Sequence, residues 1–140
     1  MSAGGSIVRH ELQREPGTGF IRFVLRGPLD ETDAVRIIDE FEQLATPGHP
    51  VFVLGDTRQA THMTSGARKA FGESNNPAFK KAYFAGFGAS FAFRIVANMA
   101  LKTMAVLSSH TVGALFNEEA DARAWLLEKQ QAYLARSAES

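Results

Sequence analysis

The chain has no cysteine among its 140 residues, which excludes disulfide bridges, a thiolate nucleophile and any zinc site built on cysteine. It also has no excess of charge, because 15 Lys and Arg residues balance 15 Asp and Glu residues. No net field therefore draws it to nucleic acid or to an anionic membrane. The start MSAGGSIVRHELQ lacks the apolar core of a signal peptide, so we expect a cytoplasmic protein.

Motifs of common catalytic and cofactor sites are missing as well. The histidines, His10, His49, His62 and His110, have no spacing typical of metal ligands. There is no GxSxG elbow, and GFGASF at residues 86–91 does not follow the GxGxxG pattern. Aromatic residues do not alternate with Lys and Arg as on a nucleic-acid platform. We expect no enzymatic activity, no metal, no cofactor and no nucleic-acid partner.

What the sequence does contain is regular alternation of short apolar segments. Two segments between residues 6 and 27 have the period of half-buried strands and predict a hairpin. Gly27 and Pro28 are expected to stop its second strand. Helical spacing follows, with Asp30 or Thr32 as the N-cap.

The rest of the chain alternates strands with helices. We expect strands at residues 51–56, 80–88 and 111–116, and helices at residues 64–73, at residues 89–107 and after an Asn117 N-cap. This order predicts an α/β domain with a mixed, mostly parallel sheet of about five strands and about four helices. One domain would span residues 1–140, with its core at about residues 7–129 and a polar C-terminal tail that frays.

The stretch after the strand VFVLGD resembles the switch region of a known family. Asp56 ends the strand, TRQATHM follows as a loop, and Thr64, Ser65 and Gly66 begin the next helix. Acidic residues and ARAWL follow the last strand. Together this order is similar to the STAS domain of anti-sigma-factor antagonists and, more closely, to the SpoIIAA-like (STAS/SEC14) proteins. The resemblance implies a STAS-like fold.

The resemblance also implies a candidate regulatory site. Ser65 matches the family's phosphorylated serine best, and Thr64 is the second candidate. The family's preceding aspartate is missing here, since Met63 precedes Thr64, so the resemblance transfers the fold better than the switch. A phosphate would lie at a helix N-terminus, which favours negative charge, but either hydroxyl could equally be a plain N-cap. Asp56 would cap or orient the loop, or be a solvated carboxylate at the end of the strand.

The helix at residues 89–107 has more apolar surface than a sheet-covering helix needs. Arg94, Asn98 and Lys102 share one narrow stripe, and most of the remaining surface is apolar. The two cations make it a poor membrane-spanning segment. Its surface would be buried in its own domain or serve a ligand pocket, a homodimer interface or a membrane contact. The candidate ligand or interface residues are Phe91, Ile95, Met99 and Met104.

Two functions follow as expectations. The first is a non-enzymatic regulatory or protein-interaction module, switched by phosphorylation at Ser65, whose partner would be a regulatory kinase or another signalling protein. The alternative is a carrier or sensor of a small apolar ligand, a fatty acid or lipid, in a SEC14-like pocket. A homodimer is compatible with either.

Overall fold

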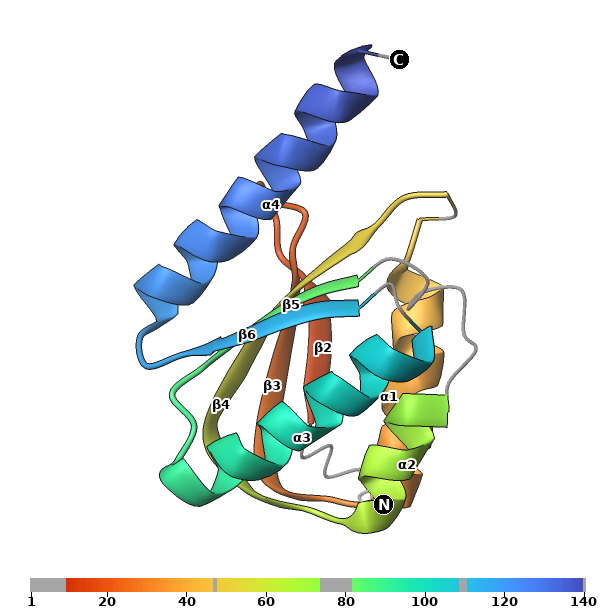
Figure 1. Cartoon of the computed structure of the whole chain (residues 1–140), viewed down its shortest axis with the longest axis vertical. Helices are drawn as coiled ribbons and strands as arrows, with labels where there is room; N and C mark the ends of the chain where they lie inside the picture. Colours follow the sequence, from red (N-terminus) through yellow and green to blue (C-terminus); the bar gives the residue numbers. More distant parts are fainter. Residues whose placement is uncertain (1–9, 47, 74–81, 109–110, 140) are drawn as a thin grey trace, which may run out of the picture.

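A five-stranded sheet lies between two unequal helical layers (Figure 1). The computed structural model describes residues 10–46, 48–73, 82–108 and 111–139. The strands are β2 (Glu11–Arg14), β3 (Ile21–Leu29), β4 (Val51–Met63), β5 (Ala82–Phe87) and β6 (Thr111–Phe116). The helices are α1 (Glu31–Leu44), α2 (Ser65–Glu73), α3 (Phe91–Ser108) and α4 (Glu119–Glu139).

The sheet has the order β2-β3-β4-β5-β6, in which only β2 is antiparallel to its neighbour. This confirms the mixed, mostly parallel sheet and the four helices. Helices α1, α2 and α3 pack on one face through a large apolar core, while α4 packs alone on the other face (Figure 1). Because all four parallel strands run the same way, the helices begin at the edge of the sheet where those strands end.

The prediction that Gly27 and Pro28 stop the second strand is wrong. β3 continues to Leu29 through two register shifts, and Gly27 takes a positive φ of 72° there. The buried His10 supplies hydrogen bonds at this irregular point: its Nδ1 accepts from the Arg26 N–H at 3.2 Å, and its Nε2 donates to the Pro28 carbonyl at 3.0 Å. A long-range side chain thus replaces ladder bonds that the bulges disturb.

The expected loop at residues 57–63 is also absent. β4 continues without interruption to Met63, because the lengthened β3 still pairs with it, out to Leu29 beside Met63. Residues 57–63, which we expected to form a loop, are therefore part of β4.

The helix ends agree with the sequence at the start of α1 and differ at the start of α3 and at both ends of α4. Asp30 caps α1 in a capping box with Asp33, as one of the two alternatives predicts. Ser90 caps α3, with its Oγ accepting from the Phe93 N–H at 3.2 Å. Asn117 does not cap α4, which begins at Glu119; its side chain accepts a hydrogen bond from Arg94 instead. α4 includes the tail that we expected to fray, and runs to Glu139.

Glycines let Phe84 lie flat on the sheet beneath the three-helix layer. A Cβ on Gly55 would lie 2.6 Å from the Phe84 ring, and one on Gly86 would lie 3.0 Å from that ring and 2.8 Å from Leu115. Both glycines stand beside each other in the β4–β5 register. The close approach at Gly86 thus comes from packing within the domain.

We predict that Gly55→Ala destabilises the fold by about 1–3 kcal/mol, because the new methyl group overlaps the Phe84 ring. Urea unfolding at neutral pH measures the change. In a Phe84→Leu background the smaller side chain leaves room, so the same substitution should cost clearly less. An equal cost in both backgrounds would contradict this packing.

Candidate functional site

Thr64 and Ser65 occupy different positions at the start of α2. The Thr64 hydroxyl accepts from the Ala67 N–H at 3.1 Å, so Thr64 is the N-cap. Its own N–H donates to the Leu29 carbonyl at 3.0 Å, which ties α2 to the end of β3. Of the two hydroxyls, the one that caps α2 is therefore that of Thr64.

Ser65 is the first residue of α2, and its side chain is exposed. Arg68 and Lys69 follow it by three and four residues, at spacings that bring helical side chains together. Gly66 lies against the first turn of α1, where a Cβ would be 3.1 Å from the Glu31 carboxylate. The site therefore combines the exposed Ser65 hydroxyl, the N-terminus of α2 and two cationic side chains, all of which favour a phosphate. The nearby Glu31 carboxylate would repel it.

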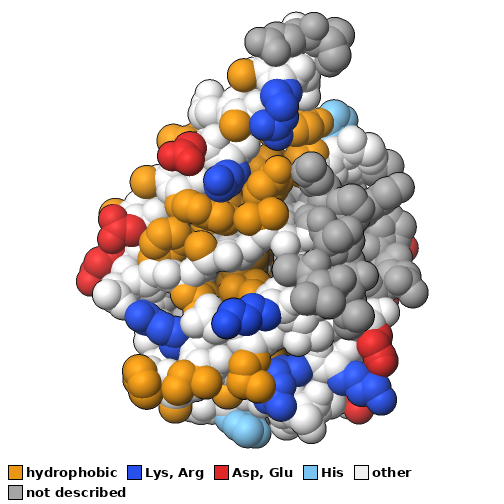
Figure 2. Space-filling model, viewed as in Figure 1, with side chains coloured by type: hydrophobic (Ala, Val, Ile, Leu, Met, Phe, Trp, Pro, Cys, Tyr) orange, Lys and Arg blue, Asp and Glu red, His pale blue; other side chains and the backbone are white. Residues whose placement is uncertain are grey.

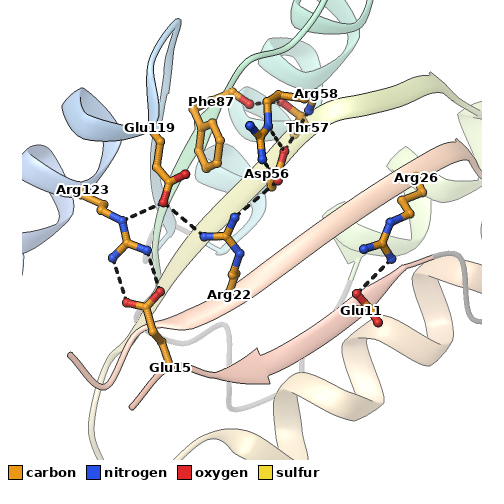
Figure 3. Close-up of polar contacts among 10 residues, drawn as sticks. All are labelled: Glu11, Glu15, Arg22, Arg26, Asp56, Thr57, Arg58, Phe87, Glu119 and Arg123. Carbon is orange, nitrogen blue, oxygen red and sulfur yellow. Dashed lines mark hydrogen bonds and ion pairs between the residues drawn. The ribbon is translucent and has the colours of Figure 1, made fainter. Parts of the chain in front are cut away.

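Asp56 is buried in a polar network on the α4 side of the sheet, which excludes the solvated carboxylate (Figure 3). The Arg58 side chain donates two hydrogen bonds to its carboxylate, from Nε to Oδ1 at 3.0 Å and from Nη2 to Oδ2 at 2.8 Å. Arg22 reaches it from β3 at 3.4 Å. The guanidinium of Arg58 lies 5.4 Å from the centre of the Phe87 ring. Through Arg22, Asp56 links β4 to β3. The residues that follow Asp56 are strand, so it orients no loop.

The network continues from Arg22 to α4 and to the β2–β3 turn (Figure 3). Arg22 donates to Glu119 at 3.2 Å, and Glu119 also accepts from Arg123 at 2.8 Å. Arg123 then forms two bonds to the carboxylate of Glu15, at 2.8 and 2.6 Å. Positive and negative side chains alternate along the whole row, so the exposed face carries little net charge.

The ion pairs lower the carboxylate pKa values. Hydrogen bonds from Arg123 lower the pKa of Glu15 to about 2, and they also lower the pKa of Glu119. Hydrogen bonds from Arg58 lower the pKa of Asp56 below its usual value. These three carboxylates are thus ionised at neutral pH, and they serve to hold α4 and the strands together.

We predict that Glu15→Gln destabilises the protein by about 1–3 kcal/mol at pH 7, since Arg123 loses one of its two charged partners and keeps only Glu119. The folded-state pKa of Glu15 lies below its unfolded value, so its contribution is present above about pH 4.3 and is lost as the pH falls toward 2. Urea unfolding should therefore show the two proteins converging in stability at low pH.

The matched control is Glu11→Gln, which removes the exposed pair between Glu11 and Arg26. We expect it to change the free energy of unfolding by less than about 1 kcal/mol. If both variants lost the same stability, or if the Glu15 effect persisted at pH 2, the role of this ion pair would be wrong.

The structure places three of the apolar candidates on the outer surface of α3. Phe91 is 80 % exposed, and Ile95 and Met99 are about half exposed. They succeed one another at intervals of four residues, so they form one slanting row. Of Met104, only its place in α3 is described, and its side chain lies outside the described residues. Figure 2 shows hydrophobic side chains gathered over the N-terminal half of α3, with Lys and Arg side chains beside them.

The inner face of α3 borders a cavity of about 80 Å³. Its wall on α3 is formed by Phe93, Ala97, Ala100 and Leu101. Side chains from the sheet, α1 and α2 complete it, and all but Thr57 and Thr111 are apolar. Engineered cavities of about 150 Å³ in other proteins bind benzene or xenon. This cavity is smaller than that, and Phe91, Ile95 and Met99 are not among its described lining residues.

The described part of the chain lacks two other kinds of feature, a membrane-spanning helix and a cluster of metal ligands. No described helix is long and apolar enough to cross a membrane. No group of three or more His, Asp and Glu residues among those described could hold a metal ion.

Comparison with known proteins bears on the fold. No family model matches the sequence, and no curated protein matches it. One solved structure, an uncharacterized protein of the DUF3478 family with a SpoIIAA-like fold from Shewanella loihica PV-4, is similar to this chain with a TM-score of 0.54. The two are 19 % identical, and the match covers 84 % of this chain and 91 % of that one.

Proposed function

We propose that this chain, which has the SpoIIAA-like fold that the sequence resemblance implied, is a protein-interaction module that binds its partner through the outer row of α3. The observation that carries the proposal is the exposure of Phe91, Ile95 and Met99 side by side. Single exposed apolar residues are ordinary, but adjacent large ones commonly mark a binding surface.

Charge indicates what kind of partner fits. The segment at residues 91–108 contains Arg94 and Lys102 but no Asp or Glu. On the α4 side, in contrast, the carboxylates of Asp56, Glu119 and Glu15 are paired with arginines. A surface that combines apolar side chains with acidic ones would complement the α3 row.

We predict that a photo-crosslinking residue, p-benzoyl-phenylalanine, captures a partner protein when it replaces Ile95 in the native host. Val35 on α1 is the matched control, because both side chains are 49 % exposed. Mass spectrometry of the adducts identifies what was captured. Adducts of the same kind at both positions, or none at position 95, would contradict the proposal.

Regulation at Ser65 is part of this proposal. Its exposed hydroxyl, the N-terminus of α2 and the cations at positions 68 and 69 support modification by phosphate. Helix α2 packs against α3, so the added charge would act close to the partner surface. Because the partner is expected to be acidic, the phosphate would repel it.

We predict that Ser65→Asp lowers the yield of the Ile95 adduct several-fold, since it adds negative charge beside an acidic partner. Ser65→Ala is the control and should leave the yield unchanged, because the capping hydroxyl belongs to Thr64. Equal yields from wild type, Ser65→Asp and Ser65→Ala would show that this position does not regulate binding.

The cavity under α3 favours a second function, the binding of a small apolar molecule. Its lining is almost entirely apolar, which suits hydrocarbon. At about 80 Å³, however, a fatty acid would require α3 to move away from the sheet. The carrier function is therefore our second candidate.

A further inference from the structure

A polar hollow of about 330 Å³ lies on the α4 side of the sheet, over strands β2, β3 and β4. Helix α4 leaves it open, because that helix packs mainly on β4, β5 and β6. Three arginines, two glutamines, two carboxylates and one valine line the hollow. Sites for small molecules have volumes of roughly 300–1,000 Å³, so the hollow is large enough for a small ligand.

A β-bulge turns two consecutive residues of β4 toward this hollow. Val24 on β3 stands opposite Asp56, and Arg26 stands opposite Gln59, so β4 has one residue more than β3 over this stretch. Neighbouring side chains of a regular strand point to opposite faces, whereas Arg58 and Gln59 both line the hollow. Bulges redirect side chains in this way beside functional sites.

Arg22 and Arg58 meet at the edge of the hollow although both are cations (Figure 3). The Nη2 atoms of both lie against the same oxygen of Asp56, Oδ2, at 3.4 and 2.8 Å. Their Cζ atoms also lie 6.0 and 5.4 Å from the centre of the Phe87 ring. Asp56 thus holds two guanidinium groups next to each other. Because the protein has already ordered them, a ligand does not have to, which lowers the entropic cost of binding.

The guanidinium groups stand closer to solvent than the carboxylate that holds them. The side chain of Arg58 is 60 % exposed and that of Asp56 only 5 %. Nη1 of Arg58 has no hydrogen-bond partner among the described residues. Charges balance along the row that runs on to Glu15, but the lining of the hollow has three arginines and two carboxylates. The hollow therefore favours an anion.

We propose that this hollow binds a small organic anion, whose phosphate or carboxylate oxygens lie against Arg22 and Arg58. Guanidinium groups suit such oxygens because their N–H donors have a fixed, planar arrangement. Val24, which is 9 % exposed, offers apolar contact to a short carbon body. The side-chain amides of Gln13 and Gln59 have no partner among the described residues, so they are available to hydroxyl groups of that body.

The ligand site is separate from the partner surface. No residue of α3 is among the described residues that line the hollow, and neither is Ser65. A small anion would replace water at the guanidinium groups with charge-assisted hydrogen bonds, so it avoids the cost of burying this charged face under a protein. Loss of one site therefore leaves the other intact.

NMR titration tests the proposal, with inorganic phosphate and succinate as the two probes at constant ionic strength. We expect saturable shifts of the arginine Nε–H signals of Arg22 and Arg58 with at least one probe. Tighter binding of phosphate would assign the natural ligand to phosphate esters, and tighter binding of succinate would assign it to carboxylates. Absence of saturable shifts with both probes would overturn the proposal.

A pair of glutamine variants shows whether the hollow itself is responsible. Substituting Arg58 would leave the buried Asp56 short of a partner, so the test uses Gln59→Glu, which adds negative charge to the lining without removing an ion pair. We expect it to weaken binding of the better probe by at least about fivefold. Gln131→Glu makes the same change at an exposed position of α4 outside the hollow, and should alter the affinity by less than about twofold. Equal weakening by the two variants would show a general effect of charge and contradict a site in the hollow.

Discussion

The paired hydrogen bonds between Arg123 and Glu15 join the start of α4 to the β2–β3 turn, more than a hundred residues earlier in the chain. They set how α4 lies on its face of the sheet, and from there the polar network runs through Glu119, Arg22 and Asp56 to Arg58. Arg58 in turn packs against Gly88, where a Cβ would lie 2.3 Å from its Cγ. One continuous row of contacts thus extends from α4 to the residues that precede α3.

This arrangement gives the two faces of the sheet different properties. The α4 side presents a charged but balanced surface, in which arginines and carboxylates neutralise one another. On the other side, α3 buries its alanine-rich inner row and exposes Phe91, Ile95 and Met99. The exposed row of α3 is therefore the better binding surface for a partner. Burying its apolar side chains is favourable, whereas burying the ion pairs of the α4 side would require removing water from charged groups.

Periodicity was sufficient to predict the order of the elements and the antiparallel pairing of the first strand, because both depend on local pattern and turn residues. It failed at Gly27–Pro28 and at residues 57–63, where the strands continue through pairing and through a His10 contact between distant residues. Asp56 shows the same limit, since its environment comes from Arg22 on another strand as well as Arg58 nearby. The excess apolar surface of α3 was visible in the sequence, but only the packing shows which side chains are exposed.

The central claim is that this domain binds a protein rather than carrying a lipid. Native mass spectrometry of the protein purified gently from its own host, followed by denaturation of the same sample, tests it most directly. We predict a complex whose additional mass is a second polypeptide, with phosphate on Ser65 in a fraction of chains not bound to that partner. An additional mass of a few hundred daltons that is lost on denaturation and extracts into organic solvent would contradict the account and favour the apolar ligand.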